Sequence, residues 1–460
     1  MARIVVVSNR VPVPKMRGAS AGGLAVALKD IMIPGSMWFG WSGRISERTE
    51  IVPTIVEGRG VNYVTIDLSA DDHRKFYLGF SNGTLWPLLH FRLGLMHFRR
   101  EDYQGYLAVN RAYASALGDL VESEDLLWVH DFHLIPLARL LRTAEVKNRI
   151  GFFLHTPFVP PTVISALPVA RDLLMDLLHY DVVGFQAQEH AQDFIECVVR
   201  ILGARVAGDT VHFKGQATRV LVCPIGIDAD ALVREARRAE RSAENLRMRE
   251  SLGDKALAIG VDRLDYSKGL PDRFEGFARL LARHPEHHRK ISFLQIAPVS
   301  RQEVVEYKSL RLELDRLAGH LNGQYSQFDW VPLRYSTRAT RREVLAGFYR
   351  IAKIGLVTPL RDGMNLVAKE FVAAQDEGDP GVLILSSLAG AAEELTEALI
   401  VNPYDPDEIA DALHIALVMP RDERKARHAA LKKKVWRTTA AAYCQRFLQA
   451  LSDPVEASAA

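Results

Sequence analysis

The sequence has few cysteines, no long apolar run and almost no net charge. Each of these three properties excludes a class of protein. Only three cysteines, Cys197, Cys223 and Cys444, occur in 460 residues, too far apart for a disulfide framework or a zinc motif. No apolar stretch approaches the ~20 residues that a membrane span needs. A net charge of +2 gives no reason to expect binding to nucleic acid. We therefore expect a cytoplasmic protein without a nucleic-acid or membrane partner.

The chain also lacks the pattern of a signal peptide and the motif of a nicotinamide enzyme. An apolar strand pattern begins at once, at Ile4–Val7, and Ser8–Arg10 follows where a nicotinamide enzyme would have G-x-G-x-x-G. Asp-x-Asp pairs, which bind metal in some enzymes, occur at 228–230 and 405–407. Both stand at predicted helix starts, where an aspartate caps the helix, so we expect no metal and no cofactor.

Short apolar strands alternate with helical patterns along the chain. The strands are continuous apolar runs, which is typical of parallel sheets covered by helices on both faces. A break at Cys223–Asp228 separates two series, so we predict two doubly wound α/β domains. The predicted strands are 4–7, 63–66, 126–130, 150–154, 182–185 and 220–222, then 257–261, 291–296, 354–357, 382–385 and 399–401.

Polar and charged residues gather where these strands end. Ligands of open α/β sheets bind beyond the carboxyl ends of the strands, so these positions are candidate binding residues. Any one of them is more often a surface residue, but the set is rich in cations and glycines, which suits a phosphorylated, hydroxyl-rich ligand. The positions are Arg10, Gly22, Gly23, Asp131, His155, Arg263, Lys268, Arg301 and 362–370.

The segment after the 354–357 strand carries the strongest signal. Asp362-Gly363 is a turn, and the first amides of the following helix, near Met364 to Leu366, have no intrahelical acceptor. Such amides bind hydroxyl or phosphate oxygens. Glu370 lies about one turn further on the same side, where its carboxylate can accept from both hydroxyls of a ribose. An ordinary strand-to-helix turn with a capping aspartate is the alternative.

Ordered segments spanning about residues 4 to 420 carry a resemblance to a known family. The chain resembles the retaining GT-B glycosyltransferases of family 20, the trehalose-6-phosphate synthase family. The matching segments are Ser8–Arg10, Ser20–Leu24, Trp38–Gly43, Phe80–Asn82, Leu85–Pro87, His130–Leu134, Gly151–His155, Val261–Leu270, Thr358–Glu370 and Asn402–Asp405.

The resemblance implies an α/β GT-B fold, with two doubly wound Rossmann-like domains facing each other across a cleft. Residues 1–224 would bind the acceptor and residues 225–435 the nucleotide sugar. Residues 436–460 would form a helix that packs back on the first domain, with a frayed tail. The implied reaction is retaining transfer of glucose from a nucleotide sugar, with UDP-glucose as the expected donor, to glucose 6-phosphate, which gives α,α-trehalose 6-phosphate.

The resemblance also implies a role for each candidate residue. Arginines would grip the acceptor phosphate, while aromatic faces and a carboxylate would hold the acceptor sugar. Glycines would let the backbone approach the donor, and cations would neutralise its diphosphate. The acceptor residues are Arg10, Trp41, Tyr77, Trp86, Asp131 and Arg301. The donor residues are Gly22, Gly23, Arg263, Lys268, Thr340, Asp362, Gly363, Met364, Asn365, Leu366, Val367, Ala368, Lys369 and Glu370.

The catalytic residues that the resemblance implies are Asp131, His155, Arg263, Lys268 and Asp362. His155 would touch the donor sugar rather than act as a general base, because retention in this family is thought to proceed by front-face attack. The leaving phosphate would then take the proton of the acceptor. Packing roles are the structural alternatives, as a satisfied half-buried histidine for His155 and as core side chains for Trp41 and Trp86.

Several alternatives stay open. Position 340 is a threonine where some relatives have a bulky residue near the donor base, so GDP- and ADP-glucose are alternative donors. Glycerol 3-phosphate and a cyclitol phosphate are alternative acceptors. A catalytically silent sugar-phosphate sensor would be expected to lack Asp131, Arg263, Lys268 or Glu370, and all four are present. Assembly into a homo-oligomer, a dimer or a tetramer, is a further expectation.

Overall fold

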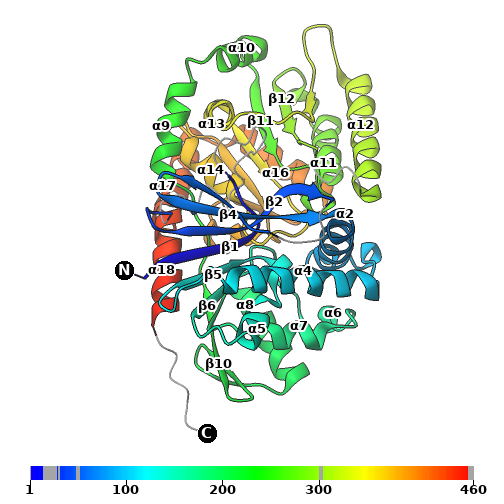
Figure 1. Cartoon of the computed structure of the whole chain (residues 1–460). Coiled ribbons are helices and arrows are strands. Elements are labelled where there is room, and N and C mark those ends of the chain that lie inside the picture. The colour runs from blue at the N-terminus through cyan, green and yellow to red at the C-terminus, as the bar shows by residue number, and fades with distance from the viewer. Residues whose placement is uncertain (1, 14–27, 29–31, 48–51, 300–303, 454–460) are drawn as a thin grey trace. The chain divides into compact units, whose positions relative to one another are not determined.

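The computed structural model describes residues 2–13, 28, 32–47, 52–299 and 304–453. The chain divides into two compact units, residues 1–225 with 440–460, and residues 226–439 (Figure 1). The domain limits predicted from the sequence were 224/225 and 435/436, and the two units of the structure meet at 225/226 and 439/440. No helix of the described part of the chain is both long enough and apolar enough to cross a membrane.

The first unit is built on a ten-stranded sheet with the order β3-β4-β2-β1-β5-β6-β7-β10-β9-β8. The strands from β4 to β10 in this order run parallel, and β3, β9 and β8 are antiparallel additions at the two edges. The bounds are β1 Ile4–Arg10, β2 Met37–Ser46, β3 Thr54–Gly58, β4 Val61–Ser69, β5 Leu126–His130, β6 Arg149–Phe153, β7 Val182–Phe185, β8 Arg205–Ala207, β9 Thr210–Phe213 and β10 Gln216–Val222.

Helices connect these strands, and one of them, η1, is a π-helical segment that carries Tyr77. The bounds are α2 Ala70–Asp72, η1 His73–Leu85, α3 Trp86–Leu89, η2 Leu93–Leu95, α4 Arg100–Gly118, η3 Phe132–Leu134, α5 Leu137–Thr143, α6 Pro161–Ile164, α7 Ala170–Leu177, α8 Gln188–Cys197 and η4 Val198–Leu202.

The C-terminal helix α18, Ala440–Ser452, belongs to the first unit (Figure 1). Its Phe447 ring stacks on Trp128 of β5, with the ring centroids 4.4 Å apart. Glycines at 151 and 184 make room for this ring, since a Cβ there would lie 2.7 Å and 2.8 Å from it. Arg149 donates to the carbonyl of Leu451 at the helix end. The last helix therefore completes the core of the first sheet.

The second unit is built on a six-stranded sheet, all parallel, with the order β13-β12-β11-β14-β15-β16. Its strands are β11 Ala256–Val261, β12 Ile291–Ile296, β13 Leu333–Ser336, β14 Ile354–Val357, β15 Val382–Ser386 and β16 Leu399–Val401. Its helices are α9 Ala229–Ala239, α10 Ala243–Leu252, η5 Tyr266–Lys268, α11 Leu270–Arg283, η6 Pro285–His287, α12 Val305–Tyr325, α13 Arg342–Ile351, α14 Leu366–Ala374, α15 Ala391–Glu394, α16 Pro406–Val418 and α17 Arg421–Arg437.

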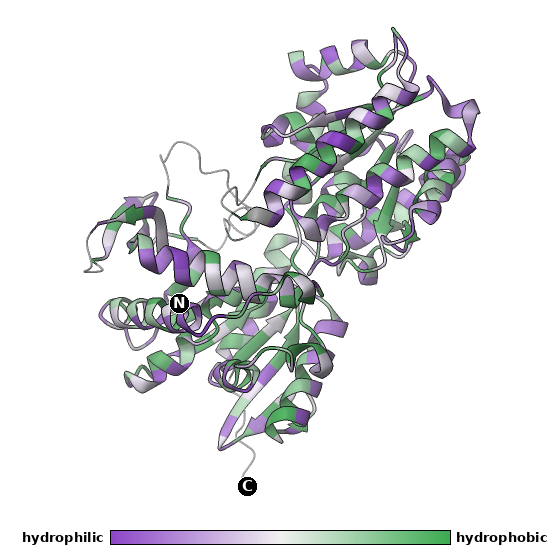
Figure 2. Cartoon of the chain, turned by 90° about the vertical axis from the view of Figure 1, so that its right-hand side faces the viewer, coloured by the Kyte–Doolittle hydropathy of each residue, from purple (hydrophilic) through white to green (hydrophobic). Residues whose placement is uncertain are grey.

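The strands are rich in hydrophobic residues in both units, as expected for sheets covered on both faces (Figure 2). Every predicted strand coincides with an observed strand, and the doubly wound α/β prediction is confirmed. The strands β2, β3, β8, β9 and β13 were not predicted.

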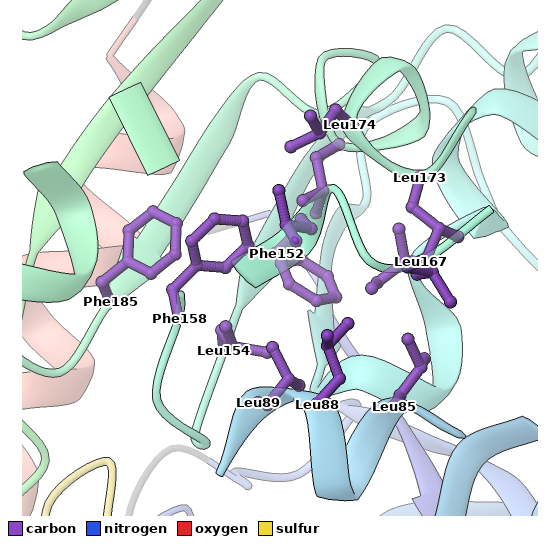
Figure 3. Close-up of a pocket in the computed structure, with 13 residues that line it drawn as sticks. Leu85, Leu88, Leu89, Phe152, Leu154, Phe158, Leu167, Leu173, Leu174 and Phe185 are labelled. Atoms are coloured by element: carbon purple, nitrogen blue, oxygen red, sulfur yellow. The ribbon is translucent and has the colours of Figure 1, made fainter. Parts of the chain in front are cut away.

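A small apolar cavity of about 20 Å³ lies inside the first unit, between α3, α7 and the strands β6 and β7 (Figure 3). Its lining consists of leucine, isoleucine and phenylalanine side chains, such as Leu85, Phe152 and Leu174. A cavity of this size without polar partners does not hold a sugar phosphate, so it is a packing gap in the core.

Candidate functional site

Polar side chains follow three neighbouring strands of the first sheet, β5, β6 and β7. Asp131, His155 and Gln186 stand just beyond the carboxyl ends of these strands. Asp131 has φ 74° and ψ 165°, a conformation that is strained for a residue with a side chain. Its main-chain N–H donates to the carbonyl of Phe153, and its Oδ1 accepts from the N–H of His155 over 3.3 Å. The sheet therefore holds this carboxylate in a strained position at its edge.

A hydrogen-bond chain fixes the tautomer of His155. The N–H of Ile225 donates to Oε1 of Gln186 over 2.8 Å, so the amide NH₂ of Gln186 must face Nδ1 of His155, 3.2 Å away. His155 Nδ1 is thus an acceptor, and its proton sits on Nε2, 3.1 Å from Nδ1 of His130. The remaining nitrogen of His130, Nε2, is buried without a partner among the described residues.

Both histidines are neutral at pH 7. Burial lowers the pKa of His155 to about 3. Burial, followed by a coulombic contribution from the neighbouring His155, lowers the pKa of His130 well below its usual range. Because both ring nitrogens of His155 are engaged, the residue is an oriented, neutral imidazole and not a poised general base.

A cation and two aromatic rings form an adjoining group in the first unit. Arg10 ends β1 in an exposed position, with its guanidinium carbon 5.9 Å from the ring centroid of Trp41. Gly43, at φ 87°, lies against this guanidinium, where a Cβ would come within 2.6 Å. The ring of Tyr77 lies 5.8 Å from that of Trp41 and stacks on His133. A cation beside flat apolar faces suits a phosphorylated sugar.

Trp86 is packed about as deeply as Trp41, and more deeply than Arg10, Tyr77 and Asp131. Its side chain is 6% exposed, and its ring centroid lies 4.1 Å from that of His90 and 5.8 Å from that of Phe132. Trp41 is also buried, and its Nε1 donates to the carbonyl of Arg44. Both tryptophans therefore serve in packing, whatever surface they also offer to a ligand.

In the second unit, the loops after β11 and β14 bring Lys268 and Asp362 together. The Lys268 ammonium lies 2.5 Å from Oδ2 of Asp362, and the Asn365 amide donates to the same oxygen over 3.1 Å. The side chains of Lys268 and Asp362 are 11% and 16% exposed. Lys268 is therefore a positioned cation at the carboxyl edge of the sheet, and not a solvated loop lysine.

A buried arginine that sequence reasoning missed ties these loops together. Arg273 of α11 is fully buried and donates to Oδ2 of Asp262, to Oε1 of Gln295 and to Oγ1 of Thr358. A fourth hydrogen bond goes to the carbonyl of Lys268 over 3.3 Å. In the sequence, Arg273 could be noticed only as a charged residue beside apolar residues in a predicted helix. Its guanidinium can be buried because four hydrogen-bond acceptors surround it.

Asn365 begins helix α14. It has φ 85° and ψ 91°, and its side-chain oxygen accepts from the N–H of Ala368 over 3.3 Å. The amides of Leu366 and Val367 have no acceptor within the helix. A helix therefore starts where the sequence predicts one, with Asn365 and not Asp362 as the capping residue, and its binding of anions or hydroxyls stays a prediction.

Glu370 lies one turn into α14 and is half-buried beside α9 and α13. Burial raises its pKa to about 7; Arg342 and Tyr349 oppose this rise, and Glu235 adds to it. Arg342 also pairs with Glu235 over 3.5 Å. A carboxylate in such surroundings is a strong acceptor for a hydroxyl group when it is ionised.

The remaining predicted residues fall into three groups. Arg263 is exposed after β11, and Thr340 lies between β13 and α13. Met364, Ala368 and Gly363 are buried, and so is Lys369, whose ammonium lies 2.6 Å from Oε2 of Glu394. That side chain is therefore committed to an ion pair. Gly22, Gly23 and Arg301 lie outside the described residues.

The two Asp-x-Asp pairs stand at helix starts, as predicted. Asp228 caps α9 by accepting from the N–H of Ala231, and Asp405 caps α16 by accepting from the amides of Asp407 and Glu408. These aspartates therefore have a structural role in the folded chain.

Comparisons with known proteins agree with the fold. The family model of glycosyltransferase family 20 matches residues 2–453. A trehalose-6-phosphate synthase of Enterobacter sp. (strain 638) is 46% identical over 437 residues, which cover 95% of this chain and 92% of the relative.

Two solved structures are similar over nearly their whole length. One is an alpha,alpha-trehalose-phosphate synthase (UDP-forming) from Burkholderia xenovorans in complex with glucose-6-phosphate, with 43% identity, a TM-score of 0.94, and coverage of 98% of this chain and 100% of that one. The other is a trehalose-6-phosphate structure from E. coli bound with UDP-2-fluoro glucose, with 42% identity, a TM-score of 0.93 and coverage of 99% and 100%. These matches confirm the predicted GT-B fold class. The chain belongs to glycosyltransferase family 20.

Proposed function

We propose that this chain transfers glucose from UDP-glucose to glucose 6-phosphate with retention of configuration, which gives α,α-trehalose 6-phosphate and UDP. The observation that carries this proposal is that two relatives, similar over nearly the whole chain, were solved with glucose-6-phosphate in one case and UDP-2-fluoro glucose in the other. The geometry of each unit offers groups that fit one of these ligands.

The second unit carries the groups for the donor. Lys268, held by Asp362, and the exposed Arg263 would neutralise the diphosphate, whose charge grows as the glucosyl bond breaks. The free amides at the start of α14 would bind sugar hydroxyls or phosphate oxygens. Glu370 would accept from the ribose hydroxyls, because an ionised carboxylate is an acceptor only.

The first unit carries the groups for the acceptor. Arg10 would bind the phosphate of glucose 6-phosphate, and Trp41 and Tyr77 would line the sugar ring. Asp131 would accept from acceptor hydroxyls, and its strained backbone fixes where it does so.

The reaction forms a bond from the acceptor's anomeric oxygen to C1 of the donor glucose, and it breaks the bond from C1 to the β-phosphate. The acceptor proton passes to the leaving phosphate oxygen, which gains charge as the bond breaks. His155 is neutral with both ring nitrogens engaged, so its proposed role is to shape the site against the donor sugar.

Arg10 would bind the phosphate of any phosphorylated acceptor, so it does not select the acceptor sugar. The acceptor and the donor base are therefore tested together. We expect UDP-glucose with glucose 6-phosphate to be the fastest pair in a panel of UDP-, GDP- and ADP-glucose against glucose 6-phosphate, glycerol 3-phosphate and a cyclitol phosphate. Faster turnover with another acceptor would replace the proposed product, and no turnover with any pair would favour a sensor. Faster turnover with GDP-glucose would mean that the donor base expected near Thr340 is guanine and not uracil.

Two further predictions from the sequence remain for experiment. Sedimentation or light scattering would test the proposed homo-oligomer, a dimer or a tetramer. Cell fractionation would test the proposed cytoplasmic location.

A further inference from the structure

Three histidines and a glutamate meet in the second unit, at His284, Glu286, His287 and His414. Each offers one ligand atom, and these atoms all lie within 4.8 Å of one another. Nε2 of His287 is 2.9 Å from Nδ1 of His414, and Nδ1 of His284 is 3.0 Å from Oε1 of Glu286. The rings of His284 and His414 stack with their centroids 3.9 Å apart.

The packing of α11 against α16 brings these residues together. Gly276 allows the close approach, since a Cβ there would lie 2.8 Å from Cβ of Ile409. Arg283, the last residue of α11, binds Asp411 of α16 over 2.7 Å and also pairs with Asp407. The next turn of α16 presents His414. His284 directly follows α11, and the short turn η6 presents Glu286 and His287.

The cluster lies far from the proposed donor groups within the second sheet. His284 to His287 precede β12 and so stand at the amino ends of the strands, where Ala256 at the start of β11 donates to Lys290. Lys268, Asp362 and Glu370 follow the carboxyl ends of the strands, at the opposite edge. The histidine cluster is therefore no part of the proposed transferase site.

The chemistry of the cluster matches one class of ligand. Imidazole nitrogens and a carboxylate oxygen are the usual ligands of Zn²⁺, which takes four of them tetrahedrally at about 2.0–2.2 Å. Four ligands at that distance lie roughly 3.3 Å apart, so the contacts of 2.9 Å and 3.0 Å would open slightly, and the wider separations, within 4.8 Å, would close by side-chain rotation. Side-chain exposures of 21% for His284 and 54% for Glu286 leave a path from solvent.

The positive charge nearest in sequence is already balanced. The guanidinium of Arg283 is paired with the two carboxylates of Asp407 and Asp411, so it does not stand as an unpaired charge against an incoming cation. The hydrogen bond between His287 and His414 also requires that at least one of the two rings is unprotonated, as a metal ligand must be.

We propose that His284, Glu286, His287 and His414 form a tetrahedral zinc site that clamps the end of α11 to α16. The site would be structural, because four protein ligands leave no open position for a substrate. It would stabilise the second unit without taking part in glucosyl transfer.

The test is zinc titration of untagged protein that has been stripped with a chelator, in competition with a chromophoric chelator. We expect one tight Zn²⁺ per chain, a rise in Tm on adding Zn²⁺, and the absorption spectrum of tetrahedral Co²⁺ when cobalt replaces zinc. The double variant H284Q/H414Q should bind Zn²⁺ roughly 100-fold more weakly or worse, with transferase activity unchanged.

Two further variants keep the test decisive. E286Q alters only an exposed ligand, so it should fold normally and still weaken Zn²⁺ binding and change the Co²⁺ spectrum. H320Q removes an exposed histidine of α12 and should bind Zn²⁺ like the wild type. The proposal would be overturned if the wild type bound no zinc, or if H284Q/H414Q and E286Q both bound it as tightly as H320Q.

Discussion

Burial raises the pKa of Glu370 to about 7, because the carboxylate is withdrawn from water and Glu235 adds a like charge nearby. The ionised form, which a ribose needs as an acceptor, therefore becomes scarce just below neutral pH. At the residue scale, this one carboxylate links the affinity for nucleotide to proton uptake.

Glu370→Gln is expected to weaken the binding of UDP. The amide keeps the shape but loses the charge and one acceptor face, so a hydrogen bond worth ~1.5–3 kcal/mol is lost, or roughly ten- to hundredfold in affinity. Calorimetric titration of UDP measures this, with Glu343→Gln, at an exposed position of α13, as the matched control. Equal affinities for wild type and Glu370→Gln would reduce Glu370 to a helix residue.

The pH dependence of UDP binding should carry the same signature. Below about pH 7, Glu370 is protonated in the protein without nucleotide and must release a proton before it can accept from the ribose. The affinity for UDP should therefore fall up to tenfold for each unit by which the pH is lowered. Above pH 7 the affinity should level off. The ionisation of the nucleotide itself is common to both proteins, so the difference between wild type and Glu370→Gln isolates the carboxylate. Parallel profiles would disprove the link.

At the element scale, strands were easier to predict than the loops that carry the chemistry. The strands β5, β7, β12, β14 and β16 were predicted with their observed bounds, because each is a short segment dominated by apolar residues. The strand β2 was missed, since Gly40, Ser42 and Gly43 interrupt its apolar residues. Nothing local marks the π-helix η1 either. Local sequence thus predicts buried strands and fails where packing decides the backbone.

The same limit applies to the candidate site. Asp131, His155 and Lys268 could be proposed as site residues from the sequence, because they follow predicted strands. Gln186 was missed, because its role depends on β6 and β7 being neighbours and on Ile225, all distant in sequence. The strained backbone at Asp131 is likewise held by contacts with β6. Strand ends can be read from one segment, but their partners depend on the order of the strands.

Gln186→Glu tests the hydrogen-bond chain across these strand ends. A carboxylate can only accept, so it should draw the proton of His155 from Nε2 to Nδ1 and disturb the bond to His130. We expect kcat to fall roughly tenfold or more, with little change in either KM, since one mis-set hydrogen bond is worth about 1 kcal/mol or more.

The readout that separates this from simple destabilisation is the ¹⁵N resonances of the His155 ring, which should exchange their protonated and unprotonated positions. Gln192→Glu, at an exposed position of α8, is the control. An unchanged tautomer in Gln186→Glu would contradict the assigned chain.

At the scale of the whole molecule, the two proposed sets of binding residues belong to different units. Arg10, Trp41 and Asp131 lie in the first unit, and Lys268 and Glu370 lie in the second. The family model matches residues 2–453, so the match includes the residues of both proposed sets. We expect neither set to need a metal, because Lys268 and Arg263 would supply positive charge for the diphosphate.

Glucosyl transfer is therefore expected to survive exhaustive chelation, while the thermal stability of the protein falls and recovers with Zn²⁺. The two readouts separate because the proposed zinc site lies at the other edge of the second sheet. Activity and Tm measured on the same chelated sample test this. Loss of activity that Mg²⁺ or Mn²⁺ restores would return the Asp-x-Asp pairs at 228–230 and 405–407 to the candidate metal ligands.

The most direct test of the central proposal is a proton NMR spectrum of the product that the chain forms from UDP-glucose and glucose 6-phosphate. We predict α,α-trehalose 6-phosphate, with two α-anomeric protons, no free reducing end, and UDP released in equal amount. A β-linked product would contradict retention, and a spectrum showing only hydrolysed glucose would contradict transfer to the proposed acceptor.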